Sequence, residues 1–171
     1  MSHYRFTQAL GLLFSLGVTA GCANTGIAYI GANDEAEFAE CRRGALAMDA
    51  SATSNRSSAQ FVAAARQMQH CVEEERERDA EAASQQLLQL HAQSILAFIK
   101  GGDAPAARAA LIDFQASYPA RDLYFADNTS VVDTLSVLLG TTPTDAEAGD
   151  LLNVAPLVSS EIRRIDYWQS N

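Results

Sequence analysis

The segment from Ser57 to Lys100 contains neither proline nor glycine, and this feature limits the chain most. Proline and glycine are the residues that most readily interrupt a helix, whereas alanine, the strongest helix former, supplies 31 of the 171 residues. Apolar side chains recur at helical spacing from Phe61 to Val72 and again from Leu87 to Ile99, on either side of a charged run at residues 73–79. We therefore expect an all-α fold with one long helix near residues 57–100, about 65 Å in length if straight or bent near residues 79–84.

The first residues of the chain have the organisation of a secretory signal. Arg5 is the only charged residue before Asp34, and residues 9–20 form an uncharged apolar run. A helix that crosses a bilayer needs about 20 apolar residues, so this run is too short to span and instead fits the apolar region of a signal peptide. We expect the signal peptide to cover residues 1–21.

The apolar run ends in the sequence VTAGC, residues 18–22. Two small residues followed by a cysteine resemble the lipobox of bacterial lipoproteins, although Thr19 stands where leucine is usual. The resemblance implies cleavage before Cys22, acylation of that cysteine and attachment to the membrane through its acyl chains. Ala23, where aspartate would retain a lipoprotein at the inner membrane, implies the outer membrane by the same resemblance. We expect the domain to face the periplasm, although position 23 does not decide between the periplasm and the cell surface. An ordinary signal cleaved after Ala20 would instead release a soluble periplasmic protein.

Two cysteines, Cys41 and Cys71, remain once the lipid-bearing cysteine is set aside. In an oxidising compartment an even remainder indicates one disulfide, and both residues lie on expected helices that flank the polar stretch 49–58. A metal site needs more ligands, and neither His70 nor His91 has a partner at the spacing that such sites use. We therefore expect a Cys41–Cys71 disulfide and no bound metal.

The mature chain divides into a short tether and one domain. We expect the tether over residues 22–33 and a single all-helical domain over residues 34–171. A first helix should begin near Asp34, where an Asp-x-x-Glu capping box stands, and should end at about Met48. A second helix should begin at Ser57, after a polar loop.

Residues 102–119 resemble the second helix of a tetratricopeptide repeat. The matching residues are Gly102, Asp103, Ala107, Leu111, Phe114, Tyr118 and Pro119. The resemblance implies a tetratricopeptide-like helical hairpin in which residues 85–100 form the first arm, although that arm departs from the repeat consensus. A generic helical hairpin with the same turn is the alternative. On either interpretation, we expect His91 on the apolar stripe to be a core residue.

The C-terminal third supplies further helices. One is expected within residues 122–140, stopped by Gly140, and another after the Thr-x-x-Glu capping box at residues 144–147. Pro156 should kink or split this last region. The apolar residues of the region are Leu151, Leu152, Val154, Leu157, Ile162 and Ile165. Tyr167 and Trp168 are expected to clamp the terminus onto the helical bundle.

The composition and the motifs of the chain limit the classes of function that we expect for it. The chain carries 12 Lys and Arg against 21 Asp and Glu, a net charge of −9, whereas nucleic-acid binding needs clustered basic residues. No motif of nucleophilic, metal-dependent or nucleotide-dependent catalysis is present, so we expect no enzyme, no catalytic residue, no cofactor and no small-molecule substrate.

We expect an outer-membrane-anchored periplasmic lipoprotein that acts as a helical adaptor or scaffold for an envelope complex, in secretion, pilus formation or outer-membrane assembly. The alternative is a soluble periplasmic binding or inhibitor module without a lipid anchor. An open apolar groove would favour the adaptor, and an aqueous cleft with converging polar groups would favour the soluble module.

Overall fold

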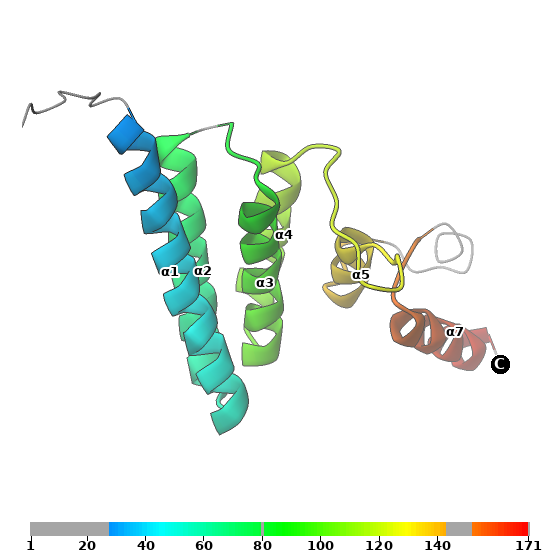
Figure 1. Cartoon of the computed structure of the whole chain (residues 1–171). Helices are drawn as coiled ribbons and strands as arrows, with labels where there is room; N and C mark the ends of the chain where they lie inside the picture. The colour runs from blue at the N-terminus through cyan, green and yellow to red at the C-terminus, as the bar shows by residue number, and fades with distance from the viewer. Residues whose placement is uncertain (1–27, 80, 143–151, 171) are drawn as a thin grey trace, which may run out of the picture.

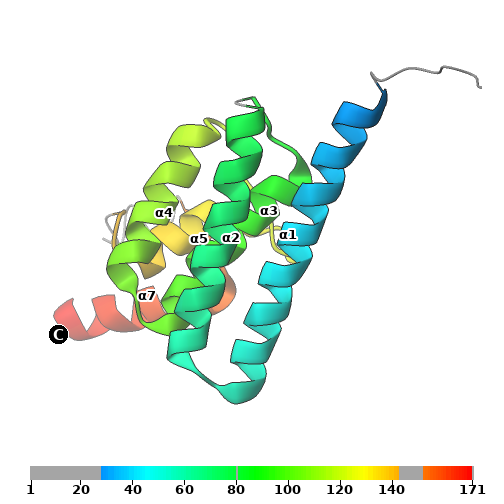
Figure 2. The same ribbon diagram turned by 90° about the vertical axis from the view of Figure 1, so that its left-hand side faces the viewer.

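The computed structural model describes residues 28–79, 81–142 and 152–170. These residues form six helices and no strand, and a single antiparallel bridge joins Tyr124 to Ser130. The predicted all-α fold is therefore confirmed. The helices are α1 (Ala28–Asn55), α2 (Ser58–Arg78), α3 (Gln85–Gly101), α4 (Ala104–Ser117), α5 (Val131–Leu138) and α7 (Pro156–Ser170). Figures 1 and 2 show three successive layers, first α1 with α2, then α3 with α4, then α5 with α7.

Helix α1 is longer at both ends than the sequence indicated. It begins at Ala28, within the segment 22–33 that we expected to be a tether, and not near Asp34. It also continues past the expected end at Met48 as far as Asn55. The first hairpin therefore consists of two long helices joined by a tight turn.

The polar stretch 49–58 is mostly helical, and two of its hydroxyl side chains bond within the helix. Thr53 and Ser54 donate to the backbone carbonyl oxygens four residues earlier, at 2.9 and 3.0 Å. Ala52 is fully buried, so packing also favours the helix here. The expected loop is reduced to the turn before Ser57, which caps α2, as predicted, by accepting the N–H three residues later.

Residues 57–100 form two helices, so the alternative of one continuous helix is wrong, and the interruption lies where the bent alternative placed it. The break lies at residues 79–84. Asp79 ends α2 with extended backbone, and its carboxylate accepts the N–H two residues later at 3.0 Å. Ser84 then caps α3 by accepting the N–H of Leu87 at 3.2 Å. The reversal lets the apolar faces of α2 and α3 bury each other, which one straight helix would leave exposed.

Helix α3 lies at the centre of the core. Its buried residues are Leu87, Leu88, Leu90, His91, Ala92, Ser94, Ile95, Ala97 and Phe98. Gly102 reverses the chain with a left-handed φ of 79°, and Asp103 caps α4 by accepting the N–H of Ala106. The expected face of α4 is buried against α3, including Leu111 and Phe114. The predicted hairpin is confirmed.

Helix α5 occupies only the last part of residues 122–140, where we expected one helix. The preceding loop is organised by the carboxylate of Asp122, which accepts from the hydroxyl of Ser130 at 2.6 Å. Ser130 in turn caps α5, so the helix begins directly after it. Gly140 stops the helix with a φ of 64°, as the sequence predicted. The capping box at residues 144–147 lies outside the described residues.

Pro156 is the first residue of α7, and the described residues directly before it, 152–155, are not helical. The segment before it is held by α5, where the hydroxyl of Thr134 accepts the N–H of Ala155 at 3.0 Å. Tyr167 and Trp168 were expected to clamp the terminus onto the bundle. That prediction was wrong, because the two residues are 60% and 68% exposed.

Candidate partner-binding surface

Two of the three predicted site residues come together. Cys41 on α1 and Cys71 on α2 form a disulfide with Cα atoms 5.7 Å apart, and this prediction is confirmed. The bond closes a loop with a sequence separation of 30, which in the chain-entropy description contributes roughly 3–4 kcal/mol of stability. Cys22, the predicted lipidation site, lies outside the described residues.

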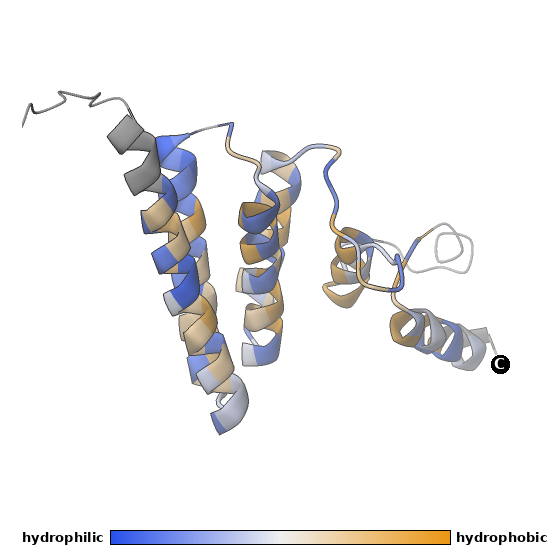
Figure 3. Ribbon diagram, in the orientation of Figure 1, coloured by the Kyte–Doolittle hydropathy of each residue, from blue (hydrophilic) through white to orange (hydrophobic). Residues whose placement is uncertain are grey.

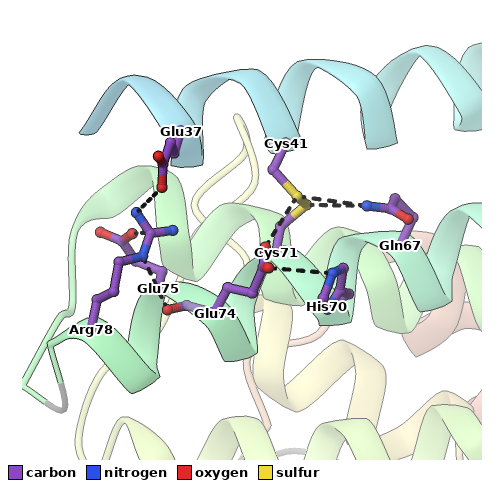
Figure 4. Close-up of polar contacts among 8 residues, drawn as sticks. All are labelled: Glu37, Cys41, Gln67, His70, Cys71, Glu74, Glu75 and Arg78. Carbon is purple, nitrogen blue, oxygen red and sulfur yellow. Dashed lines mark hydrogen bonds and ion pairs between the residues drawn. A yellow bond between two sulfur atoms is a disulfide. The ribbon is translucent and has the colours of Figure 1, made fainter. Parts of the chain in front are cut away.

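Polar side chains surround this disulfide (Figure 4). The amide nitrogen of Gln67 lies 3.6 Å from the sulfur of Cys41, and His70 Nε2 lies 3.4 Å from a Glu74 carboxylate oxygen. Arg78 on α2 reaches Glu37 on α1, with N and O atoms 3.8 Å apart. In the described part of the chain no group of three or more His, Cys, Asp or Glu could hold a metal ion. These contacts fix the first hairpin.

His91 is a buried core residue that packs in a cluster with two aromatic rings. Its ring lies edge-on to Phe114 and Tyr118, with centroids 5.3 and 5.8 Å away. Burial lowers the pKa of His91 from 6.5 to about 4, although the nearby Asp113 carboxylate opposes this shift. Asp113 is itself bound to Arg76 at 2.9 Å. A neutral imidazole that is 1% exposed packs the core and offers no group to a partner.

An open apolar groove of about 410 Å³ lies between α5 and α7. Its lining residues are Val137, Leu138, Leu157, Val158, Glu161, Ile162 and Ile165. Leu138 and Leu157 are 52% and 81% exposed although both are large and apolar. Figure 3 shows the hydrophobic residues at the beginning of α7 and on α5. Surfaces of this kind bind an amphipathic helix or an extended peptide.

One ion pair lies at the rim of this groove. The carboxylate of Glu161 accepts two hydrogen bonds from the guanidinium of Arg164, at 2.8 and 2.6 Å. These hydrogen bonds lower the pKa of Glu161, so the carboxylate is charged and paired at neutral pH. The groove therefore presents an apolar floor and a rim whose two charges cancel.

The exposure of the groove residues was not predictable from the sequence. Leu157 and Ile165 stand among the apolar residues expected in the final helical region, but helical periodicity marks an apolar face without showing what covers it. The structure leaves both residues exposed, with Ile165 at 41%. Only the arrangement of α5 beside α7 turns this face into a groove.

No family model, no curated protein and no solved structure matches the chain. The tetratricopeptide resemblance of residues 102–119 is thus supported only as far as the hairpin itself. Among the described helices, none is both long and apolar enough to cross a membrane. The function is inferred from the chemistry and geometry of this chain alone.

Proposed function

We propose that the protein is an outer-membrane-anchored periplasmic lipoprotein that acts as an adaptor for an envelope complex and has no catalytic role. The open groove between α5 and α7 is the observation that carries the adaptor role, because it exposes large apolar side chains to solvent. The Cys41–Cys71 disulfide agrees with an oxidising compartment. The two helical hairpins agree with the resemblance to repeat-containing adaptors.

The chemistry of the groove indicates which kind of partner segment would bind there. Its floor is apolar, so the partner should insert apolar side chains from an amphipathic helix or an extended segment. The chain as a whole carries a net charge of −9, which repels an acidic partner and favours a neutral or basic one. The partner is therefore a protein segment with an apolar face and few acidic residues.

The groove is tested by co-purification of envelope proteins with the full chain. Leu138→Glu places a charge at the groove without removing a buried side chain, because Leu138 is 52% exposed. We expect the variant to lose a co-purifying envelope protein that the wild type retains. Ile112→Glu is the matched control, since Ile112 on α4 is 61% exposed and does not line the groove. Equal recovery of every partner by both variants would remove the adaptor role.

The anchor is tested separately, by mass and by fractionation. The lipobox resemblance implies that the mature protein begins with an acylated Cys22, which mass spectrometry of the N-terminal peptide should detect. Cys22→Ala should move the protein from the membrane to the soluble fraction, because the acyl chains hold it to the bilayer. Membrane retention of Cys22→Ala at the wild-type level would contradict the anchor. An unacylated wild-type protein would favour the soluble module instead.

A further inference from the structure

One side of α7, bordering the groove, carries four exposed side chains at a spacing of four, three and four residues. They are Leu157, Glu161, Arg164 and Trp168, and we call them the α7 seam. This spacing places all four in one line along the helix, as in the core positions of a coiled coil. Leu157 and Trp168 are 81% and 68% exposed, and the side chains of Glu161 and Arg164 are 53% and 59% exposed.

We infer that the α7 seam pairs in antiparallel orientation with the α7 seam of a second copy of this chain. If a two-fold axis passes between residues 162 and 163, Leu157 lies opposite Trp168 of the second copy and Glu161 lies opposite Arg164 of the second copy. The two-fold axis makes each of these two pairs occur twice in the dimer. The apolar ends then cover each other, and the two central charges meet opposite charges.

The order of residues along the seam selects this orientation. In a parallel pair, each seam residue would face its own equivalent, so that Glu161 would oppose Glu161 and Arg164 would oppose Arg164. Like charges would then repel at the centre of the contact. Only the antiparallel arrangement satisfies all four positions at once, and the seam is self-complementary in the way that a two-fold contact requires.

The same charges explain why a second copy can approach a chain of net charge −9. Glu161 and Arg164 neutralise each other within each α7, so the seam carries no excess negative charge. The α7 helix has 15 residues, about 22 Å of length, and its contact area is below that of a standard interface. The dimer is therefore weak and forms as concentration rises. It goes beyond the proposed adaptor role, and because Leu157 and Glu161 also line the groove, pairing of two α7 helices would compete there with a bound partner.

Trp168 reports on this contact directly, because it is the chain's only tryptophan. The full chain, purified in mild detergent, should double in protein mass by sedimentation as its concentration is raised. Over the same range the emission of Trp168 should shift to shorter wavelength, since Leu157 of the second copy removes the indole from water. A constant monomer mass would overturn the proposal. Emission at short wavelength that does not change with concentration would also overturn it, because Trp168 would then lie in the micelle.

Charge reversal tests the register. Glu161→Arg and Arg164→Glu each create two like-charge contacts in the symmetric pair, so each should weaken dimerisation by about tenfold or more. The double variant E161R/R164E restores opposite charges at every contact and should recover both the dimer mass and the emission shift.

Arg163→Glu is the matched control for the single variants. It changes the charge of the same helix by the same amount as Arg164→Glu, but residue 163 lies off the seam, and the variant should dimerise like the wild type. Failure of the double variant to recover dimerisation would overturn the antiparallel pairing. So would an equal loss of dimer in Arg163→Glu and Arg164→Glu.

Discussion

His91 is uncharged in the folded protein, so its protonation opposes folding. Its pKa of about 4 lies below the usual 6.5, and the unfolded chain therefore takes up the proton first as the pH falls. The contribution of His91 to stability is complete above pH 6.5 and declines by about 1.4 kcal/mol per pH unit as the pH falls toward 4. Denaturant midpoints from pH 7 to pH 5 should decrease less in His91→Phe, which cannot titrate, than in the wild type.

His70→Gln is the control for this measurement. His70 is exposed, with a side chain 58% accessible, and its removal leaves His91 in place. The variant should keep the wild-type loss of stability on acidification. If His91→Phe loses as much stability as the wild type between pH 7 and pH 5, the burial of the imidazole does not control the titration.

At the scale of helices, α2 and α3 approach closely at Gly101. A Cβ atom there would lie 2.5 Å from a methyl group of Val62 and 3.1 Å from the carbonyl oxygen of Ser58. Gly101→Ala must therefore displace the end of α3, and we expect a loss of about 1–3 kcal/mol in the free energy of unfolding. Gly44→Ala on α1 meets no atom within 4 Å and should stabilise by up to about 1 kcal/mol. Chemical denaturation of both variants should give effects of opposite sign, and effects of the same sign would contradict the close approach.

The disulfide ties α1 to α2, and its removal should affect both cysteine variants equally. Cys41→Ala and Cys71→Ala each abolish the same bond, so each should lower the free energy of unfolding by roughly 3 kcal/mol. The double variant should lose little more than either single variant, because the bond can be lost only once. Additive losses would mean that the cysteines act through separate contacts. Unfolding by denaturant without reductant measures the free energy of unfolding of the two single variants and the double variant.

Sequence signals predicted those helix ends that depend on neighbouring residues. Ser57 and Asp103 act as caps through side chains that bond three residues ahead, and this geometry follows from local sequence. The break at residues 79–84 was left open because nothing local forces it: no proline or glycine is present, and the gain comes from packing α3 back on α2. The extension of α1 through residues 49–55 also depends on tertiary contact, since the buried Ala52 favours a helix that Ser and Thr alone would not.

At the scale of the whole molecule, the groove also could not be predicted from the sequence, because it too depends on tertiary contacts. The sequence identified apolar positions on the last helix and placed Tyr167 and Trp168 against the bundle. Whether such a face is covered depends on the position of other elements, and the structure leaves Trp168 exposed. The disulfide was predictable because, with Cys22 set aside as the expected lipidation site, only Cys41 and Cys71 remain to pair. The groove required α5 and α7 to be placed relative to each other.

The layers of the molecule are packed unevenly, and this predicts unequal local stability. Most of α3 is buried, whereas Ile162 is the only buried side chain among those described on α7. Segments with few buried contacts open at lower free energy than the core. In native-state hydrogen exchange on the full chain, α7 amides should therefore exchange by local opening well before those of α3. Protection of α7 equal to that of α3 would contradict the uneven packing.

Two alanine variants test whether the layers open separately. Ile162→Ala removes the main buried contact of α7 and should speed exchange there while leaving α3 unchanged, because α3 does not depend on that contact. Phe114→Ala removes a ring that is 1% exposed between α3 and α4, and it should cost about 3–5 kcal/mol. Because α3 amides exchange through global unfolding, this loss should raise exchange in α3 by the same free energy. If Ile162→Ala raises exchange in α3 as much as in α7, the molecule opens as one unit and the C-terminal layer has no stability of its own.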